Sequence, residues 1–138
     1  IDPGKVAIIG ARDLDLGEKD NLRSAGALVL SMEQVDRIGM VAALEQCIEQ
    51  VSRDVDGIYL SMDLDALDPR FAPGVGTPVP GGLTYREGHL ACEVVAETGK
   101  LIGMDVVEVN PILDEKNQTA KIAVEFACSA LGSRVWQG

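Results

Sequence analysis

Hydrophobic residues follow two alternating patterns along this chain. Short apolar runs, with the length and composition of buried β-strands, occupy residues 6–11, 27–30, 58–62 and 101–109. A stretch with apolar residues at helical spacing follows each run, at about 18–25, 31–51, 84–98 and 118–131. The pattern therefore predicts about four strand–helix units in succession.

Signals at the ends of these stretches support the predicted helices. Ser31 with Gln34, and Thr84 with Glu87, have the spacing of a capping box, in which each side chain bonds the other residue's backbone N–H. The helix that begins at Ser31 is expected to run unbroken to about residue 51. Two helices carry apolar residues expected to face inward: Val35, Ile38, Val41, Leu44, Ile48 and Val51 in the second, and Ile122, Phe126 and Leu131 in the last.

Alternation of strands and helices is typical of an α/β fold, in which helices cover a parallel sheet through right-handed crossovers. Ligands of open parallel sheets bind beyond the carboxyl ends of the strands. Three of the four expected strands are followed there by carboxylates: Asp13, Asp15 and Glu18 after the first, Asp63 and Asp65 after the third, and Glu108 after the fourth. An acidic pocket is therefore predicted at that edge of the sheet.

The clearest feature of this edge is the pair Asp63 and Asp65. On an extended backbone, residues two apart point to one face. Two carboxylates at a strand end suit a hard divalent cation such as Mn²⁺ or Mg²⁺. A turn does not need both side chains, which favours metal binding over a purely structural role. Asp68, before Pro69, is expected only to shape a turn.

The aspartate motif by itself leaves the reaction open. DLDAL resembles the DxDx[TV] signature of haloacid-dehalogenase-like phosphatases, but Leu67 stands where those proteins have Thr or Val. The PGVGTP loop lacks the Lys of a P-loop. Glu108 ends a run that is apolar on both faces, so its carboxylate is expected in the interior, where a guanidinium would be the best partner.

Composition narrows the class of partner. The 138 residues include 22 acidic and 12 basic side chains, a net charge of −10, which argues against nucleic acid or an anionic membrane and is compatible with cations. No apolar run is long enough to cross a bilayer. Cys47, Cys92 and Cys128 are expected to be buried, reduced thiols of a cytoplasmic protein. His89, the only histidine, is expected on a helix face or at the surface, which disfavours a Ser-His-Asp triad.

Longer motifs make the chain recognisable. SMDLDALDPRFAPGVGTPVPGGLTYREG and GMDVVEVNPILD closely resemble the carboxyl-terminal half of arginases, in the ureohydrolase family, and GARDLDLGE and SMEQVDRIGM match as well. The resemblance covers essentially the whole chain, and the motif sequences are most similar to those of bacterial arginases. It implies a three-layer α/β/α fold on a parallel sheet. It also implies hydrolysis of L-arginine to L-ornithine and urea by a hydroxide that bridges two Mn²⁺ ions.

The resemblance also implies roles for particular residues. The positions that match the family's site are Asp63 and Asp65 as metal ligands, Thr77 and the catalytic Glu108 at the guanidinium end of the substrate, and Asp15 and Glu18 at the α-amino group of arginine. Glu108 would hold the guanidinium so that its carbon faces the nucleophile. Family members form trimers or hexamers, so a homo-oligomer is expected.

Some of the family's site is missing from this sequence. The other metal ligands lie in motifs of the GGDHS and DAHxD kind, which do not occur here, and the proton-shuttle histidine has no counterpart. Two aspartates cannot supply about six ligands to each of two ions. The chain opens IDPGKVAIIG, without an initiator Met. Residues 1–138 are therefore expected to be the carboxyl-terminal portion of an arginase domain, inactive without the amino-terminal half.

Two alternatives remain open. Agmatinases and other guanidino-hydrolases share DxDxxDPxxAPGxGTP, although RDLD and EVNP favour arginase. In another class, the chain would be a non-catalytic α/β fragment or an assembly module.

Overall fold

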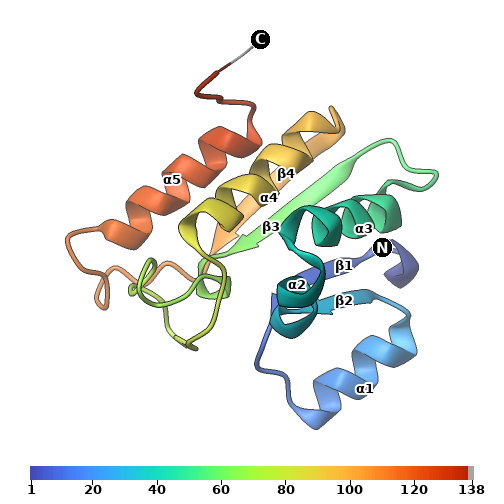
Figure 1. Cartoon of the computed structure of the whole chain (residues 1–138), viewed down its shortest axis with the longest axis horizontal. Helices are drawn as coiled ribbons and strands as arrows, with labels where there is room; N and C mark the ends of the chain where they lie inside the picture. Colours follow the sequence, from blue (N-terminus) through green and yellow to red (C-terminus); the bar gives the residue numbers. More distant parts are fainter. Residues whose placement is uncertain (137–138) are drawn as a thin grey trace. The chain divides into compact units, whose positions relative to one another are not determined.

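The structure is a computed structural model that describes residues 1–136 (Figure 1). It comprises two compact units, residues 1–56 and a second unit that begins at Gly57. Each unit contains one pair of parallel strands together with the helices that follow them. The expected α/β class, with parallel strands, is confirmed.

The first unit pairs its two strands from Ala7 opposite Leu28 to Ala11 opposite Ser31, with a shift of register between Ile9 and Ala11. Its elements are the 3₁₀ helix η1 (Pro3–Lys5), β1 (Ala7–Ala11), α1 (Leu16–Ala25), β2 (Leu28–Ser31), α2 (Met32–Ile38) and α3 (Met40–Ser52). The helices α2 and α3 both pack against the strands. The capping box of Ser31 and Gln34 is formed as predicted.

The prediction of one unbroken helix after Ser31 is wrong, because Gly39 separates α2 from α3. Its φ of 83° and ψ of 151° lie in a region that favours glycine. The interruption also breaks the predicted apolar stripe. Val35 and Leu44 are buried at 2% and 4% exposure, whereas Ile38 and Val41, on either side of the break, are 42% and 56% exposed.

In the second unit the strands pair from Ile58 opposite Leu101 to Asp63 opposite Val107. Its elements are β3 (Ile58–Asp63), the 3₁₀ helix η2 (Leu64–Ala66), α4 (Tyr85–Glu97), β4 (Leu101–Val107) and α5 (Gln118–Ala130). The helices α4 and α5 pack on each other, and α5 also contacts β4. The capping box of Thr84 and Glu87 begins α4 as predicted.

The core of this unit lies between β3, the loop that follows it, and the two helices. Its buried members are Met62, Leu64, Leu67, Ala72, Val75, Cys92, Ile122, Phe126 and Ala130. Ile122 and Phe126 face inward as predicted, but Leu131 is 76% exposed. The helix ends at Ala130, so Leu131 falls outside the helical repeat that would have turned it inward.

The cysteines behave differently from one another. Cys47 and Cys92 are buried, and burial raises the pKa of the Cys92 thiol to about 12, so it stays protonated. Cys128 is exposed, which contradicts its predicted burial. Its neighbours Phe126 and Ser129 take the inward positions of α5. Across residues 1–136, no helix combines the length and apolarity that a membrane span requires.

Candidate functional site

The strand β3 delivers the predicted aspartates to a tight turn. Exposed and buried side chains alternate along the strand, which ends at the half-buried Asp63. The Oδ1 atom of Asp63 accepts a hydrogen bond from the backbone N–H of Asp65 at 3.0 Å. Asp65 itself lies in η2, so the expectation that both residues sit on extended backbone is wrong. The turn nevertheless keeps the two carboxylates within electrostatic reach of each other.

Thr77 joins this turn from the Gly/Pro-rich loop. Its hydroxyl donates to the Oδ2 atom of Asp65 at 2.9 Å. The side chain is otherwise exposed, so the hydrogen bond sets its direction more than packing does. A predicted metal ligand and a predicted substrate residue, twelve positions apart, are thus in direct contact.

Glu108 stands one residue beyond β4, with a φ of 65° that non-glycine residues rarely adopt. Its expected burial is wrong: the side chain is exposed, because the strand ends at Val107, which is itself 37% exposed. Glu108 nevertheless lies beside the loop that carries Thr77. A Cβ added to Gly76 would stand 3.6 Å from the Oε2 atom of Glu108.

The charges of these residues act on one another. Burial raises the pKa of Asp63, and the negative charges of Asp65 and Glu108 raise it further, against the opposing hydrogen bond from the Asp65 N–H. Three carboxylates therefore converge without a cation among the causes of the shift. A bound cation would relieve this repulsion.

The donor set at the turn fits a hard divalent ion, because Asp63 and Asp65 offer carboxylate oxygens. Over residues 1–136, no group of three or more His, Cys, Asp or Glu side chains is arranged to hold a metal ion. What this turn can contribute to a metal site is therefore the aspartate pair.

Asp68 closes the loop, as predicted, and is 4% exposed. Its carboxylate accepts from the backbone N–H groups of Arg70 and Gly81 and from the Nε of Arg70. The Arg70 side chain is the main reason that the pKa of Asp68 falls well below its usual range, and the two backbone bonds add to the effect. Asp68 therefore ties together the two ends of the loop that carries Thr77.

Asp15 and Glu18, in the first unit, form a reciprocal cap on α1. The Oδ1 atom of Asp15 accepts from the Glu18 N–H at 2.8 Å, and the Oε2 atom of Glu18 accepts from the Asp15 N–H at 2.8 Å. The D-x-x-E spacing carries this signal, which the sequence-based prediction of a helix starting at about residue 18 missed. Both residues therefore have a structural role, whatever they bind.

The comparison with known proteins decides the family. The model of the arginase family matches residues 1–132. The arginase of Bacillus caldovelox is 50% identical over 135 residues, which are 98% of this chain and 45% of that protein. The chain belongs to the arginase family. It spans a little under half the length of the curated relatives that it matches.

Solved structures of the family agree with this membership. The native arginase of Bacillus caldovelox matches with a TM-score of 0.95 at 50% identity, over 99% of this chain and 46% of that one. The Entamoeba histolytica arginase, solved with L-ornithine, gives 0.87 at 32% identity, over 96% and 45%. A hypothetical agmatinase from Burkholderia thailandensis gives 0.77 at 39% identity, over 94% and 38%.

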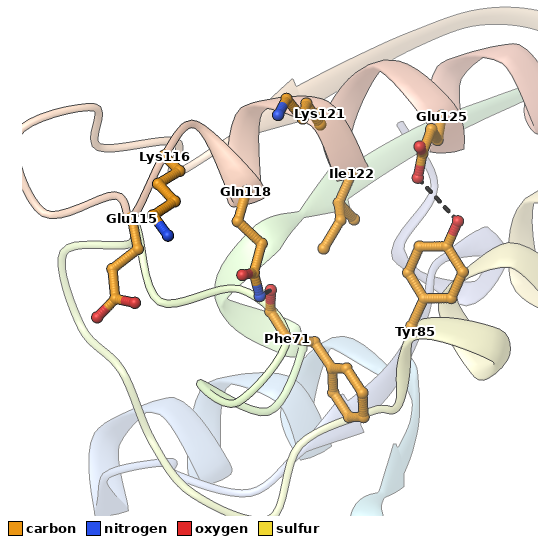
Figure 2. Close-up of a pocket in the computed structure, with 8 residues that line it drawn as sticks. All are labelled: Phe71, Tyr85, Glu115, Lys116, Gln118, Lys121, Ile122 and Glu125. Atoms are coloured by element: carbon orange, nitrogen blue, oxygen red, sulfur yellow. Dashed lines mark hydrogen bonds between the residues drawn. The ribbon is translucent and has the colours of Figure 1, made fainter.

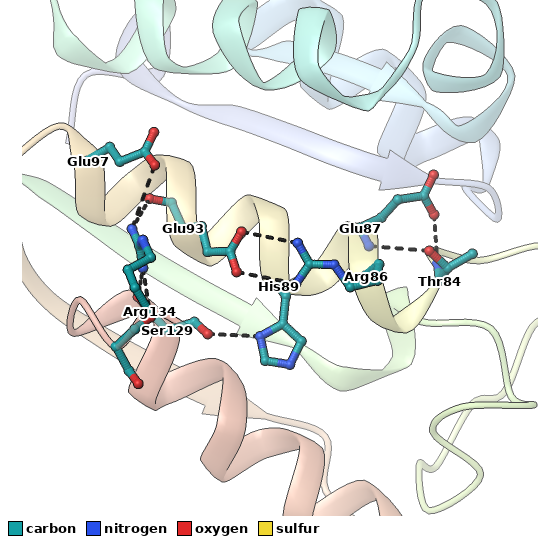
Figure 3. A network of polar contacts seen from close by, with 9 residues as sticks. Thr84, Arg86, Glu87, His89, Glu93, Glu97, Ser129 and Arg134 are labelled. Atoms are coloured by element: carbon teal, nitrogen blue, oxygen red, sulfur yellow. Dashed lines mark hydrogen bonds and ion pairs between the residues drawn. The ribbon is translucent and has the colours of Figure 1, made fainter. Parts of the chain in front are cut away.

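In this arginase-family chain, His89 lies on α4 as predicted, but it packs inward at 9% exposure instead of at the surface. Its Nδ1 atom lies 2.8 Å from the Oγ of Ser129 on α5, and Figure 3 shows the two side chains turned toward each other. Its ring meets those of Tyr85 and Phe126 edge-on, with centroids 4.5 and 4.8 Å away. The Nε2 atom is buried without a hydrogen-bond partner. The histidine thus belongs to the packing of α4 on α5.

An open pocket of about 490 Å³ lies elsewhere on the second unit, between Phe71, Tyr85 and the start of α5 (Figure 2). The hydroxyl of Tyr85 donates to Glu125 at 2.8 Å across one side of it. None of the predicted site residues lines this pocket. The turn that carries Asp63 and Asp65, called the aspartate turn below, is therefore the candidate site, and this pocket is not.

The sequence-based prediction missed the buried contact that fixes the loop that carries Thr77. The backbone N–H of Gly74 donates to the hydroxyl of the buried Thr119 at 2.8 Å. The two residues lie 45 positions apart, and no local motif links them. Only the threonine's place near a helix start could have drawn attention to it.

Proposed function

We propose that the protein containing this chain hydrolyses the guanidinium group of L-arginine to L-ornithine and urea, and that residues 1–138 are the carboxyl-terminal portion of its arginase domain. One observation carries the proposal. Asp63, Asp65, Thr77 and Glu108, from three separate segments, come together at the turn after β3 in a chain of the arginase family. Asp63 and Asp65 lie at the carboxyl end of β3 and Glu108 directly follows β4, and ligands of parallel sheets bind at such strand ends.

Asp63 and Asp65 would hold a pair of Mn²⁺ ions, since their carboxylate oxygens suit that ion. When bound, the metal pair supplies a water of lowered pKa as the nucleophile. The aspartate turn needs further ligands to complete two such sites, because manganese takes about six ligands. The hydroxyl of Thr77 keeps the Oδ2 atom of Asp65 in one orientation.

Glu108 binds the guanidinium in this proposal, because a carboxylate and a guanidinium make parallel, charge-assisted hydrogen bonds. The pair would fix the plane of the guanidinium and present its carbon to the nucleophile. Thr77, at the same end of the substrate, limits how the group can turn. Asp15 and Glu18 would bind the α-amino group of arginine through the negative charge that their carboxylates keep while they cap α1.

The test is urea release from L-arginine by the complete protein with Mn²⁺. Glu108→Gln keeps the size of the side chain and removes its charge, so kcat/KM should fall at least about thirtyfold. Glu115→Gln, at another exposed loop glutamate of the same segment, is the matched control and should stay near wild type. Equal activity of both variants would contradict the role of Glu108.

Agmatine is the alternative substrate, favoured by the structural match to the hypothetical agmatinase of Burkholderia thailandensis. The ratio of kcat/KM for arginine and agmatine decides between them. A preference for agmatine would replace the arginase assignment with an agmatinase one. No turnover of either compound would favour the non-catalytic α/β module.

The same proposal includes assembly into a homo-oligomer, a trimer or a hexamer, which the resemblance to the family supports. It also includes a cytoplasmic location, which two buried, protonated thiols support. Light scattering of the complete protein, with and without Mn²⁺, measures its size. A strict monomer under both conditions would contradict assembly.

A further inference from the structure

A buried hydrogen-bond relay joins the loop that carries Thr77 to the segment that follows Glu108. Gly74, three residues before Thr77, is buried and bonded on both sides. Its N–H donates to the hydroxyl of Thr119 at 2.8 Å, and its C=O accepts from the N–H of Asn110 at 2.7 Å. The loop backbone is therefore attached to the chain just beyond Glu108 and to the start of α5.

Asp114 completes the relay from the other side. Its carboxylate accepts from the backbone N–H groups of Thr119 at 2.9 Å and Ala120 at 3.1 Å, and so holds the first turn of α5. A Cβ added to Gly74 would come within 2.6 Å of the Cγ of Asp114. Only glycine therefore allows the loop to lie directly against this carboxylate.

Thr119 contacts both Gly74 and Asp114. Its hydroxyl oxygen accepts from the Gly74 N–H, and its backbone N–H donates to the Asp114 carboxylate. Burial alone would raise the pKa of Asp114, but the hydrogen bonds from the backbone N–H groups of Thr119 and Ala120, together with the effect of the Thr119 side chain, lower it overall. Thr119 is fully buried, at 0% exposure, so water cannot replace either bond without a rearrangement.

Thr77 and Glu108 depend on such support because neither is fixed by packing. Both side chains are exposed, and Glu108 sits on left-handed backbone. Their separation is set by whatever holds the backbone at 74–77 against the backbone at 108–110. The hydrogen bond from the Asn110 N–H to the Gly74 C=O joins these two segments directly, and the bond from Gly74 to Thr119 holds the same residue from its other side.

We infer that Thr119 and Asp114 are positioning residues for guanidinium recognition: through Gly74 they fix Thr77 relative to Glu108. This inference rests on the proposed function and adds to it two residues that touch neither substrate nor metal. A misplaced guanidinium pocket binds arginine less well and orients it less well, so loss of the relay acts on KM as well as on kcat.

The experiment uses the complete protein and three variants. Thr119→Val keeps the shape of the side chain and removes the hydroxyl that accepts from Gly74, whereas Thr119→Ser keeps the hydroxyl. Thr98→Val is the matched control, because the Thr98 hydroxyl donates to the Val95 C=O at 2.6 Å and accepts from the Lys100 N–H, at the far end of α4. Each is assayed for kcat and KM with arginine, and for hydrogen exchange in a peptide covering 72–78.

We expect Thr119→Val to raise KM and to lower kcat/KM by about tenfold or more, with faster exchange at 72–78. Thr119→Ser should stay close to wild type. Thr98→Val should change neither KM nor that exchange, because a variant that merely folds less completely loses kcat at constant KM.

Two results would overturn the inference alone: an active wild type with an unchanged KM in Thr119→Val, or unchanged exchange at 72–78. A wild-type protein that releases no urea would instead overturn the proposed function, and this inference with it. The two failures are thereby distinguishable.

Discussion

Asp15 has two roles that a single substitution can separate. It caps α1 through its Oδ1 atom and, in the proposed function, its charge attracts the α-amino group of arginine. Asn caps helices about as well as Asp, whereas Ala costs about 1 kcal/mol. We therefore expect Asp15→Asn to preserve stability but to raise KM for arginine several-fold. Asp15→Ala should both lower stability and raise KM. Urea-release kinetics and thermal unfolding of the complete protein measure the two effects.

The control for Asp15 is Ser31→Ala, which removes a cap of the same kind from α2. It should lose about 1 kcal/mol of unfolding free energy with KM unchanged. With an arginine analogue that lacks the α-amino group, wild type and Asp15→Asn should have the same KM. If Asp15→Asn left KM for arginine unchanged, the residue would be a cap only.

The buried His89 is expected to make the free energy of unfolding depend on pH. Burial lowers its pKa from the ordinary 6.5, and the charge of Arg86 lowers it further, against the opposing effects of Glu93 and Glu125. The folded protein therefore holds the imidazole neutral, while the unfolded chain binds a proton below about pH 6.5. Stability from this group is present above that pH and is lost as the pH falls toward the folded pKa.

The measurement is urea unfolding of the complete protein at several pH values from about 7.5 down to about 5. His89→Gln should lower stability by about 1–3 kcal/mol near neutral pH and show a smaller further loss on acidification. Ser129→Ala keeps the imidazole and should keep the steeper loss. Identical slopes in wild type and His89→Gln would mean that other groups set the pH dependence.

At the scale of elements, the contact of α4 with α5 depends on Gly88. A Cβ at this position would come within 2.7 Å of the Cε2 of Phe126, which is 0% exposed. Gly88→Ala gains about 1 kcal/mol of helix propensity. We nevertheless expect a net loss of about 1–3 kcal/mol, because a fully packed ring cannot move aside without strain. Denaturant unfolding measures the change.

Phe126→Leu supplies the control for that prediction. The smaller side chain makes room, so adding Gly88→Ala to Phe126→Leu should cost much less than adding it to wild type. If the two costs were equal, the strain would lie elsewhere than in the contact between residues 88 and 126.

At the scale of the whole molecule, the proposed function requires more metal ligands than Asp63 and Asp65 offer. Two aspartates would leave most of the coordination of two Mn²⁺ ions unsupplied. We expect the 138-residue chain alone, with added Mn²⁺, to release urea at a rate at least about a hundredfold below that of the complete protein. Substantial turnover by the chain alone would refute the need for further ligands.

The fold was largely predictable from the sequence, and the site only in part. The parallel strands and the boxes at Ser31 and Thr84 were predicted, since each depends on periodicity or on a contact three residues away. The break at Gly39 was missed because an isolated glycine is compatible with a continuous helix. The exposure of Glu108 was missed because β4 ends two residues earlier than its apolar run.

By itself the sequence determined the order of strands and helices apart from the break at Gly39, the pair of aspartates after the third strand, and membership of the arginase family. Those properties depend on residues close together in the chain and on long, specific motifs. Only the tertiary structure decided that Thr77 reaches Asp65, that Gly74 rests on Thr119, and that His89 lies inside. These contacts join residues 12 to 45 positions apart, and they form only when loops and helices pack on paired strands.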